Sequence, residues 1–213
     1  MSVPMGPGDP TPSAPTRLPM TATDASGRTT LRLVRASTLT GMPVVTLGGD
    51  RALEVKDVVF DKTVGGITGF TLRKPGLLGG PQKRVLPIAG VLAVGGDAVM
   101  ISSHDAFAAE DVLADVGDDV LGDRVVTDDG TELGTVVDVV ASIQGGDGDI
   151  VGFEIEGSAA LGDEGQHVYL PLPQAIAISG EAIVVPAAAR DHASADFSAF
   201  GGAVDAYRKT LEA

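Results

Sequence analysis

One pattern of apolar blocks occurs twice along this chain of 213 residues, and this repeat limits its possible folds more than any other feature. Three motifs recur in the same order, namely Val-Val beside Asp57 and Asp138, Gly-Phe at Phe70 and Phe153, and Leu-Pro at Pro87 and Pro171. The offsets between the copies are 81, 83 and 84 residues, so the copies differ only where turns change length. A unit of this length is too long for a solenoid repeat and matches a small domain. We therefore predict two tandem domains of one fold, with the Gly-Phe and Leu-Pro motifs at equivalent positions.

Short apolar runs bounded by glycine turns fill each copy, which indicates an all-β fold. The chain has 29 glycines, and no helical periodicity separates the apolar runs within a copy. Turn signals that recur about every 8–12 residues are typical of small antiparallel sheets. A sheet of this size leaves two unpaired edges unless it closes on itself. We expect two separate small β-barrels, over residues 28–103 and 121–186.

The segments before and between the copies differ from them in composition. Residues 1–27 contain six prolines and almost no bulky apolar side chains, which predicts a disordered tail. Residues 104–120 are acidic and rich in alanine, which indicates a linker with a helical turn between Ala108 and Leu113.

Apolar side chains in residues 187–213 follow the alternating spacing of three and four that marks one face of a helix. They are Phe197, Phe200, Val204, Tyr207 and Leu211. Asp196 or Ser198 is expected to cap the start of this C-terminal amphipathic helix. The two cations at positions 208 and 209 suit the negative end of its dipole.

Each copy presents its motifs in a fixed order, which runs Gly-x-x-Val, a turn, Val-x-Asp-Val-Val, a turn, Ile-x-Gly-Phe, a loop, Val/Tyr-Leu-Pro-hydrophobic, and a final Gly-Asp/Glu hairpin. This order resembles the PRC-barrel domain, over residues 30–103 and 118–186. Copy one is closer to the pattern, because copy two replaces the basic residues of one loop with Gly162-Asp-Glu-Gly165. The resemblance implies a small barrel in each copy. The domain is known from the cytoplasmic part of the photosynthetic reaction-centre H subunit and from the C-terminal half of RimM-type ribosome-maturation factors.

Neither of these settings matches the chain fully. The reaction-centre subunit carries a membrane anchor, whereas no apolar run here approaches the ~20 residues that span a bilayer. RimM-type factors have a different N-terminal domain and a single barrel. Since no basic stretch followed by an apolar core marks a secretory signal, we expect a cytoplasmic protein.

The net charge of −14 is unevenly distributed along the chain. Residues 28–103 carry ten Lys/Arg and five Asp/Glu, a net of +5, whereas residues 104–213 carry four and twenty-two, a net of −18. Such an asymmetry favours different partners for the two halves, although solubility explains the acidity of the second copy equally well. Direct nucleic-acid binding is not expected, because its affinity comes mainly from neutralising phosphates.

No catalytic residue, metal site or cofactor is expected from the sequence. The chain has no cysteine, and its three histidines, His104, His167 and His192, lack the spacing of metal ligands. Neither a phosphate-binding glycine loop nor a Gly-x-Ser-x-Gly turn is present. The stretch Gly145-Gly-Asp-Gly-Asp149 offers carboxylates but lacks the ligand order of a calcium loop, so we interpret it as a hairpin turn.

Asp57 and Asp138 occupy the same position of an otherwise apolar strand in the two copies. A buried pair of carboxylates could perform acid–base chemistry. Because these two belong to different domains, we favour a structural role in which each points outward or accepts backbone N–H bonds.

The loop over residues 73–84 is the best candidate for a binding site. Its candidate residues are Arg73, Lys74, Leu77, Leu78, Lys83 and Arg84. An exposed apolar pair surrounded by cations suits an acidic protein or an anionic membrane surface. Alternatively, the two leucines cover the mouth of the barrel and the cations only solvate its rim.

These features favour a non-catalytic protein-interaction or scaffold module that binds an acidic protein partner. The alternative is a RimM-like assembly factor, in which one barrel binds a ribosomal protein.

Overall fold

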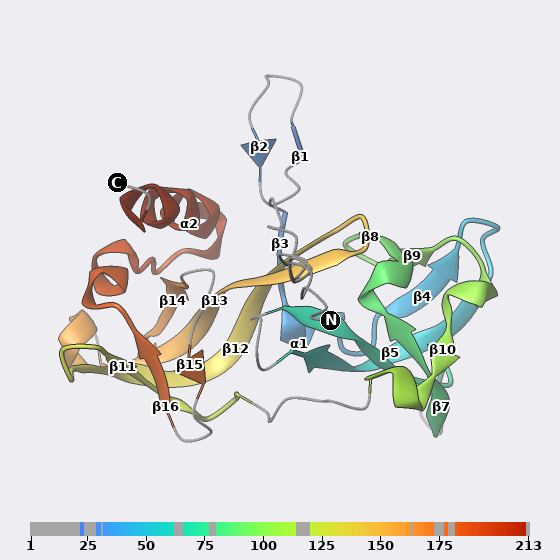
Figure 1. Cartoon of the computed structure of the whole chain (residues 1–213), viewed down its shortest axis with the longest axis horizontal. Helices are drawn as coiled ribbons and strands as arrows, with labels where there is room; N and C mark the ends of the chain where they lie inside the picture. Colours follow the sequence, from blue (N-terminus) through green and yellow to red (C-terminus); the bar gives the residue numbers. More distant parts are fainter. Residues whose placement is uncertain are drawn as a thin grey trace, which may run out of the picture.

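The computed structural model consists mostly of β-strands in two curved sheets, with a helix at the C-terminal end (Figure 1). The structure describes residues 22–23, 29–30, 32–61, 66–76, 80–113, 120–162, 164–172, 177–178 and 182–211. The first sheet contains, in spatial order, β10 (Ala108–Ala109), β7 (Pro81–Pro87), β6 (Ile67–Arg73), β5 (Arg51–Phe60), β4 (Pro43–Thr46), β9 (Val99–Ile101) and β8 (Val91–Val94). The second contains β14 (His167–Pro171), β13 (Asp147–Gly157), β12 (Glu132–Gln144), β11 (Arg124–Thr127), β16 (Ala182–Val185) and β15 (Ala177–Ile178), with β3 (Leu33–Arg35) beside β12.

The remaining elements are short. They are β1 (Ala22–Thr23), β2 (Thr29–Thr30), α1 (Ala36–Leu39) and the 3-10 turns η1 (Ile88–Gly90), η2 (His104–Ala106), η3 (Glu110–Leu113), η4 (Ala159–Leu161) and η5 (Ala187–His192). Apart from residues 22–23, which pair with residues 29–30, the tail expected over residues 1–27 lies outside the described residues.

The strand pairing shows that the two sheets are copies of one arrangement. In the first sheet β4 pairs antiparallel with β5 and parallel with β9, and in the second sheet β11 pairs antiparallel with β12 and parallel with β16. The β-bulge between Val55 and Asp57 recurs between Val136 and Asp138. Because a bulge bends its strand and increases its twist, the repeat preserves the curvature of the sheet together with its strand order.

The Gly-Phe and Leu-Pro motifs face each other in both copies, as predicted. Phe70 is paired with Leu86, and Phe153 is paired with Leu170. All four side chains are fully buried in the cores of their own halves. The repeated motifs therefore form the centre of each core.

The two barrel domains are not structurally separate, which differs from what the repeat predicts. Strand β3, from the start of the first copy, pairs with β12 of the second copy, with Val34 opposite Ala141. Ala141 and Ile143, near the far end of β12, are buried in the core of the first half, and Phe60 packs against both cores. The thirteen-residue β12 extends beyond its own core, and burying its apolar end on the neighbouring half removes that surface from water. Among the described strands no pairing joins the two ends of either sheet.

Residues 104–113 differ from the linker expected there. Strand β10 pairs with β7 and covers one edge of the first sheet, and η3 follows it directly. Phe107 and Leu113, on either side of β10, are buried. These two apolar side chains attach the segment to the first half, and a 3-10 turn forms at the end of the stretch where the sequence indicates a helical turn.

The C-terminal helix α2 (Phe197–Leu211) is confirmed. Asp196 accepts a hydrogen bond from the backbone N–H of Ser198 at 2.8 Å, which identifies Asp196 as the cap and places its pKa below the usual range. Phe200, Val204 and Tyr207 are buried against the second half. The helix therefore covers the outer face of the second sheet, as Figure 1 shows.

The hairpin turn expected at Gly145-Gly-Asp-Gly-Asp149 is also confirmed. Gly145 and Gly146 join β12 to β13, and both have positive φ angles, 56° and 87°. Glycine adopts such conformations at no steric cost, which explains the glycine pair.

Candidate functional site

The loop between β6 and β7 carries the cations that the sequence singles out, but Arg73 is separated from the others. Its guanidinium Nε donates to the carboxylate of Glu54 at 3.3 Å, directly across the β5–β6 ladder. Glu54 is buried and also accepts from Arg51 at 2.6 Å. Because a buried carboxylate requires cationic or hydrogen-bonding partners, Arg73 is committed to the sheet.

The other three cations of this loop are exposed. Lys74 follows β6, and Lys83 and Arg84 lie in β7. Arg84 rests with its guanidinium carbon 5.3 Å from the ring centroid of Phe107, a cation–π contact that holds the side chain in place. Lys74 and Lys83 form no ion pair with any described residue. Leu77 and Leu78 lie outside the described residues.

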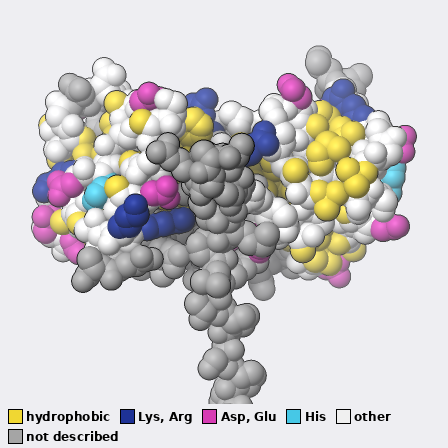
Figure 2. All heavy atoms as spheres, turned by 90° about the horizontal axis from the view of Figure 1, so that it is seen from above, with side chains coloured by type: hydrophobic (Ala, Val, Ile, Leu, Met, Phe, Trp, Pro, Cys, Tyr) yellow, Lys and Arg dark blue, Asp and Glu magenta, His cyan; other side chains and the backbone are white. Residues whose placement is uncertain are grey.

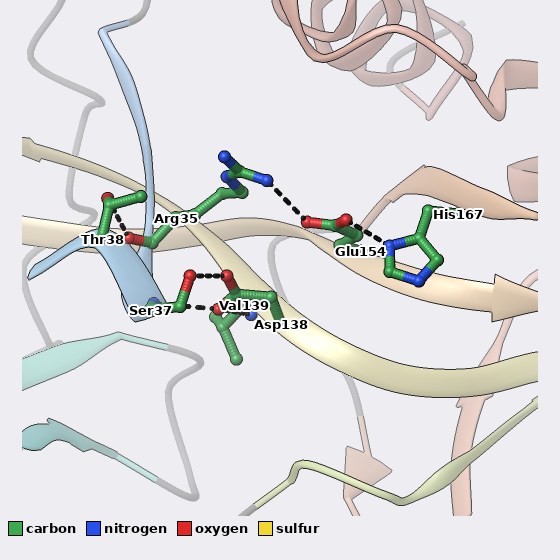
Figure 3. A network of polar contacts seen from close by, with 7 residues as sticks. All are labelled: Arg35, Ser37, Thr38, Asp138, Val139, Glu154 and His167. Atoms are coloured by element: carbon green, nitrogen blue, oxygen red, sulfur yellow. Dashed lines mark hydrogen bonds and ion pairs between the residues drawn. The ribbon is translucent and has the colours of Figure 1, made fainter. Parts of the chain in front are cut away.

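The sequence does not predict a second polar centre, which lies where β3 and α1 of the first copy meet β12 and β13 of the second (Figure 3). Asp138 is buried there and accepts from the backbone N–H of Ser37 at 3.1 Å and from its hydroxyl. It also accepts from the N–H of Val139 at 2.8 Å. Asp138 therefore caps the start of α1 from a different copy of the repeat.

Glu154 completes this centre from β13. It is buried, lies opposite Asp138 in the ladder, and accepts from Arg35 Nη1 at 3.4 Å. His167 Nδ1 lies 2.7 Å from its other oxygen. Burial alone would lower the pKa of Arg35, but its hydrogen bond to Glu154 and its electrostatic interactions with Tyr169, Glu154 and Asp138 together raise it. Asp138 and Glu154, which are paired in the ladder, thus each contact polar groups from both copies, and these contacts join the halves.

The two aligned aspartates differ in their surroundings, and both fit the structural role favoured from the sequence. Asp57 is exposed and forms an ion pair with Lys56 at 2.8 Å, whereas Asp138 is buried and accepts backbone N–H bonds. The sequence offered one signal for Glu154, namely a charged residue inside the apolar run of β13. Its partner Arg35 is 119 positions away in the chain, and no local pattern indicates it.

An exposed apolar surface is a further feature that was not predicted from the sequence. Seen from above, apolar side chains gather over the half that holds the first sheet (Figure 2). In this sheet Met100 lies opposite Val45 on one side and Ala93 on the other, and Leu92 and Leu47 are among the exposed large apolar residues. The signal was present in β8 and β9, whose residues are all apolar and so leave none polar for an outer face.

Among the described residues, no group of acidic or histidine side chains is arranged to hold a metal ion. The part of the chain that the structure describes contains no helix long and apolar enough to cross a bilayer.

A comparison with protein families matches the model described as the PRC-barrel domain twice, over residues 32–106 and residues 117–191. The first match ends at η2 and the second within η5. Each match contributes part of the polar centre, and the β6–β7 loop lies in the first. No curated protein matches the chain.

Proposed function

The chain belongs to the PRC-barrel family, with two tandem copies of the domain, and on this premise we propose that it is a non-catalytic interaction module. Its binding surface is the cationic loop defined by Lys74, Lys83 and Arg84, and its partner is a protein with an acidic surface.

The proposal rests on the exposure of these three cations. Lys74 and Lys83 form no ion pair with a described residue, and Arg84 rests on an aromatic ring, which does not neutralise its charge. Unpaired cations around one hairpin connection attract an acidic surface and fix its orientation. The corresponding loop of the second copy, between β13 and β14, has no cation and contains Glu164.

The shared core of the two halves supports a scaffold role. Strand β3 and the β12–β13 hairpin bind the halves together through pairing and apolar packing. The cationic loop in the first half and the acidic second half are therefore held on one body, so two partners of opposite charge would be held at a fixed separation.

The test is a crosslinked pull-down from native cells with a triple charge reversal, K74E/K83E/R84E. Arg73 stays unchanged, because reversing it would leave buried Glu54 short of a partner. We expect partner recovery at 0.1 M salt to fall about tenfold or more, since exposed charges drive the encounter. The matched control, K56E/R124E/K209E, makes the same change of charge at exposed sites elsewhere and should recover the partner like the wild type.

Equal recovery by both triple variants would contradict the proposal and place the working surface elsewhere. A ribosomal protein as the recovered partner would favour the RimM-like assembly role. Charge-dependent binding to vesicles with anionic lipid, without a protein partner, would assign the loop to a membrane surface instead.

A further inference from the structure

A groove of about 250 Å³ lies on the side of β3 that faces away from β12. Four consecutive residues, 32–35, line one wall, and the opposite wall is formed by the end of β8 and the turn that follows it. Successive side chains of a strand point to opposite faces. A groove lined by four in a row therefore runs along the edge of the strand.

This edge of β3 has no strand partner among the described residues. An unpaired edge presents backbone N–H and C=O groups that an extended segment can bind as an added strand. Gly95 and Gly96 on the opposite wall have no side chains to fill the space. The groove is smaller than the ~300–1,000 Å³ typical of sites that enclose a whole ligand, which suits one or two side chains of a longer segment.

Two arginines, Arg32 and Arg35, line the groove although the protein is acidic overall. None of the described residues that line it is acidic. Arg32 is exposed and forms no hydrogen bond or ion pair with a described residue. Arg35 uses Nη1 for Glu154 and rests 5.5 Å from the ring centroid of Phe197, so its remaining N–H groups are held in a fixed orientation.

The order of side chains along this wall specifies the complementary strand. Residues 32–35 read Arg-Leu-Val-Arg. Directly opposed residues of paired strands share a face, so opposite charges and apolar pairs stabilise when they are in register. We propose that the groove binds an extended protein segment of the pattern acidic-apolar-apolar-acidic, which adds to the free edge of β3. The pattern reads the same in both directions, so either strand orientation satisfies it.

This site is independent of the cationic loop at Lys74, Lys83 and Arg84. The probe is a fluorescent octapeptide with Glu-Val-Val-Glu at its centre, glycines on both sides and blocked ends. Fluorescence anisotropy should show saturable binding to the full chain. Replacing the two Glu by Lys, or the two Val by Gly, should abolish it.

Two substitutions test the groove without disturbing the core. R32E reverses the charge of an exposed side chain that forms no hydrogen bond or ion pair with a described residue, and it should weaken binding about tenfold or more. A Cβ at Gly96 meets no atom within 4 Å, so Gly96→Leu is tolerated and should block the groove. R124E, an exposed charge reversal on β11, and K74E/K83E/R84E should bind the probe like the wild type.

Backbone pairing is tested with probes that carry N-methyl groups at alternate positions of the central four residues. One of the two possible sets removes the N–H groups that face β3 and should lose binding, while the other should retain it. Wild-type affinity in both R32E and Gly96→Leu would overturn the proposal, as would equal binding of both N-methylated probes. Competition by a short fatty acid at the same concentration as the peptide would show a site for free carboxylates and overturn the strand interpretation.

Discussion

Three carboxylates inside the strands, Glu54, Asp138 and Glu154, determine which charged groups of this protein remain free. Glu54 holds Arg51 and Arg73, and Glu154 holds Arg35. A carboxylate buried without partners would destabilise the fold by several kcal/mol, so these cations serve the fold first. Arg32 and the cations of the cationic loop are not held by a buried carboxylate, and binding is assigned above to them and to the remaining N–H groups of Arg35.

The glycine of the Gly-Phe motif is a second residue whose identity the packing explains. A Cβ at Gly152 would overlap the Phe200 ring and lie 2.5 Å from the carbonyl oxygen of Leu170. At the equivalent Gly69 it would meet the carbonyl oxygen of Leu86 and lie 3.0 Å from Leu113 Cδ1. In both copies the missing side chain leaves room for an apolar residue from the segment that follows.

Gly152→Ala should therefore lower the free energy of unfolding by about 2 kcal/mol or more, since backbone on one side and a buried ring on the other must move. Gly202→Ala is the control, because a Cβ there meets nothing within 4 Å and lies in a helix. This second change should stabilise by roughly 1 kcal/mol. Urea denaturation of the two variants measures both effects, and equal stabilities would contradict the packing account.

At the scale of elements, each copy is completed by a segment that lies beyond its last strand. The first uses the short turn η3, which buries Leu113 on β6 and β7 with Val59 and Val85. The second uses the fifteen-residue helix α2, which buries Phe200 and Val204 against Tyr169 and its neighbours. The equivalent face of the sheet is thus covered by the short turn η3 in the first half and by the helix α2 in the second.

Phe200→Ala should cost about 3 kcal/mol, because it removes a fully buried ring from the centre of the helix interface. Leu211→Ala at the end of the same helix should change stability by less than about 0.5 kcal/mol, since that side chain is 47% exposed. Chemical denaturation followed by circular dichroism measures both. If Phe200→Ala unfolds at the wild-type midpoint, α2 does not contribute to the folded body.

At the scale of the whole molecule, the repeat yields one interlocked body. Strand β3 and helix α1 of the first copy pack on the second copy. The end of the β12–β13 hairpin of the second copy is buried in the core of the first. Asp138, Glu154, Ser37 and Arg35 form the polar part of this exchange. Neither half keeps all its partners when the other is removed.

Deletion of residues 1–27 should leave the unfolding midpoint unchanged, because the tail is expected to bury little. Deletion of residues 1–35 also removes β3 and Arg35, and it should cost about 2 kcal/mol or more by exposing β12 and leaving Glu154 with one fewer partner. Urea denaturation of both shortened chains beside the full chain makes the comparison. Equal midpoints for the two deletions would show that β3 does not join the halves.

Local patterns in the sequence determined the elements and their repeat. Alternating apolar runs and glycine turns specify strands and hairpins through short-range sterics and burial, which is why the Gly-Phe and Leu-Pro motifs and the helix over Phe197–Leu211 were predictable. Two copies of one pattern necessarily produced two sheets with the same order and bulges.

Only the tertiary structure decided which copy each strand joins and which charges are free. The assignment of β3 to the second sheet, the pairing of Arg35 with Glu154 across 119 positions, and the withdrawal of Arg73 from the cationic loop all depend on contacts between distant segments. No periodicity encodes such contacts, because the backbone groups of a strand edge do not depend on its sequence and a buried carboxylate accepts from whichever donor the fold places beside it. These pairings form only when the long β12–β13 hairpin packs on the first core, and that packing depends on the whole chain.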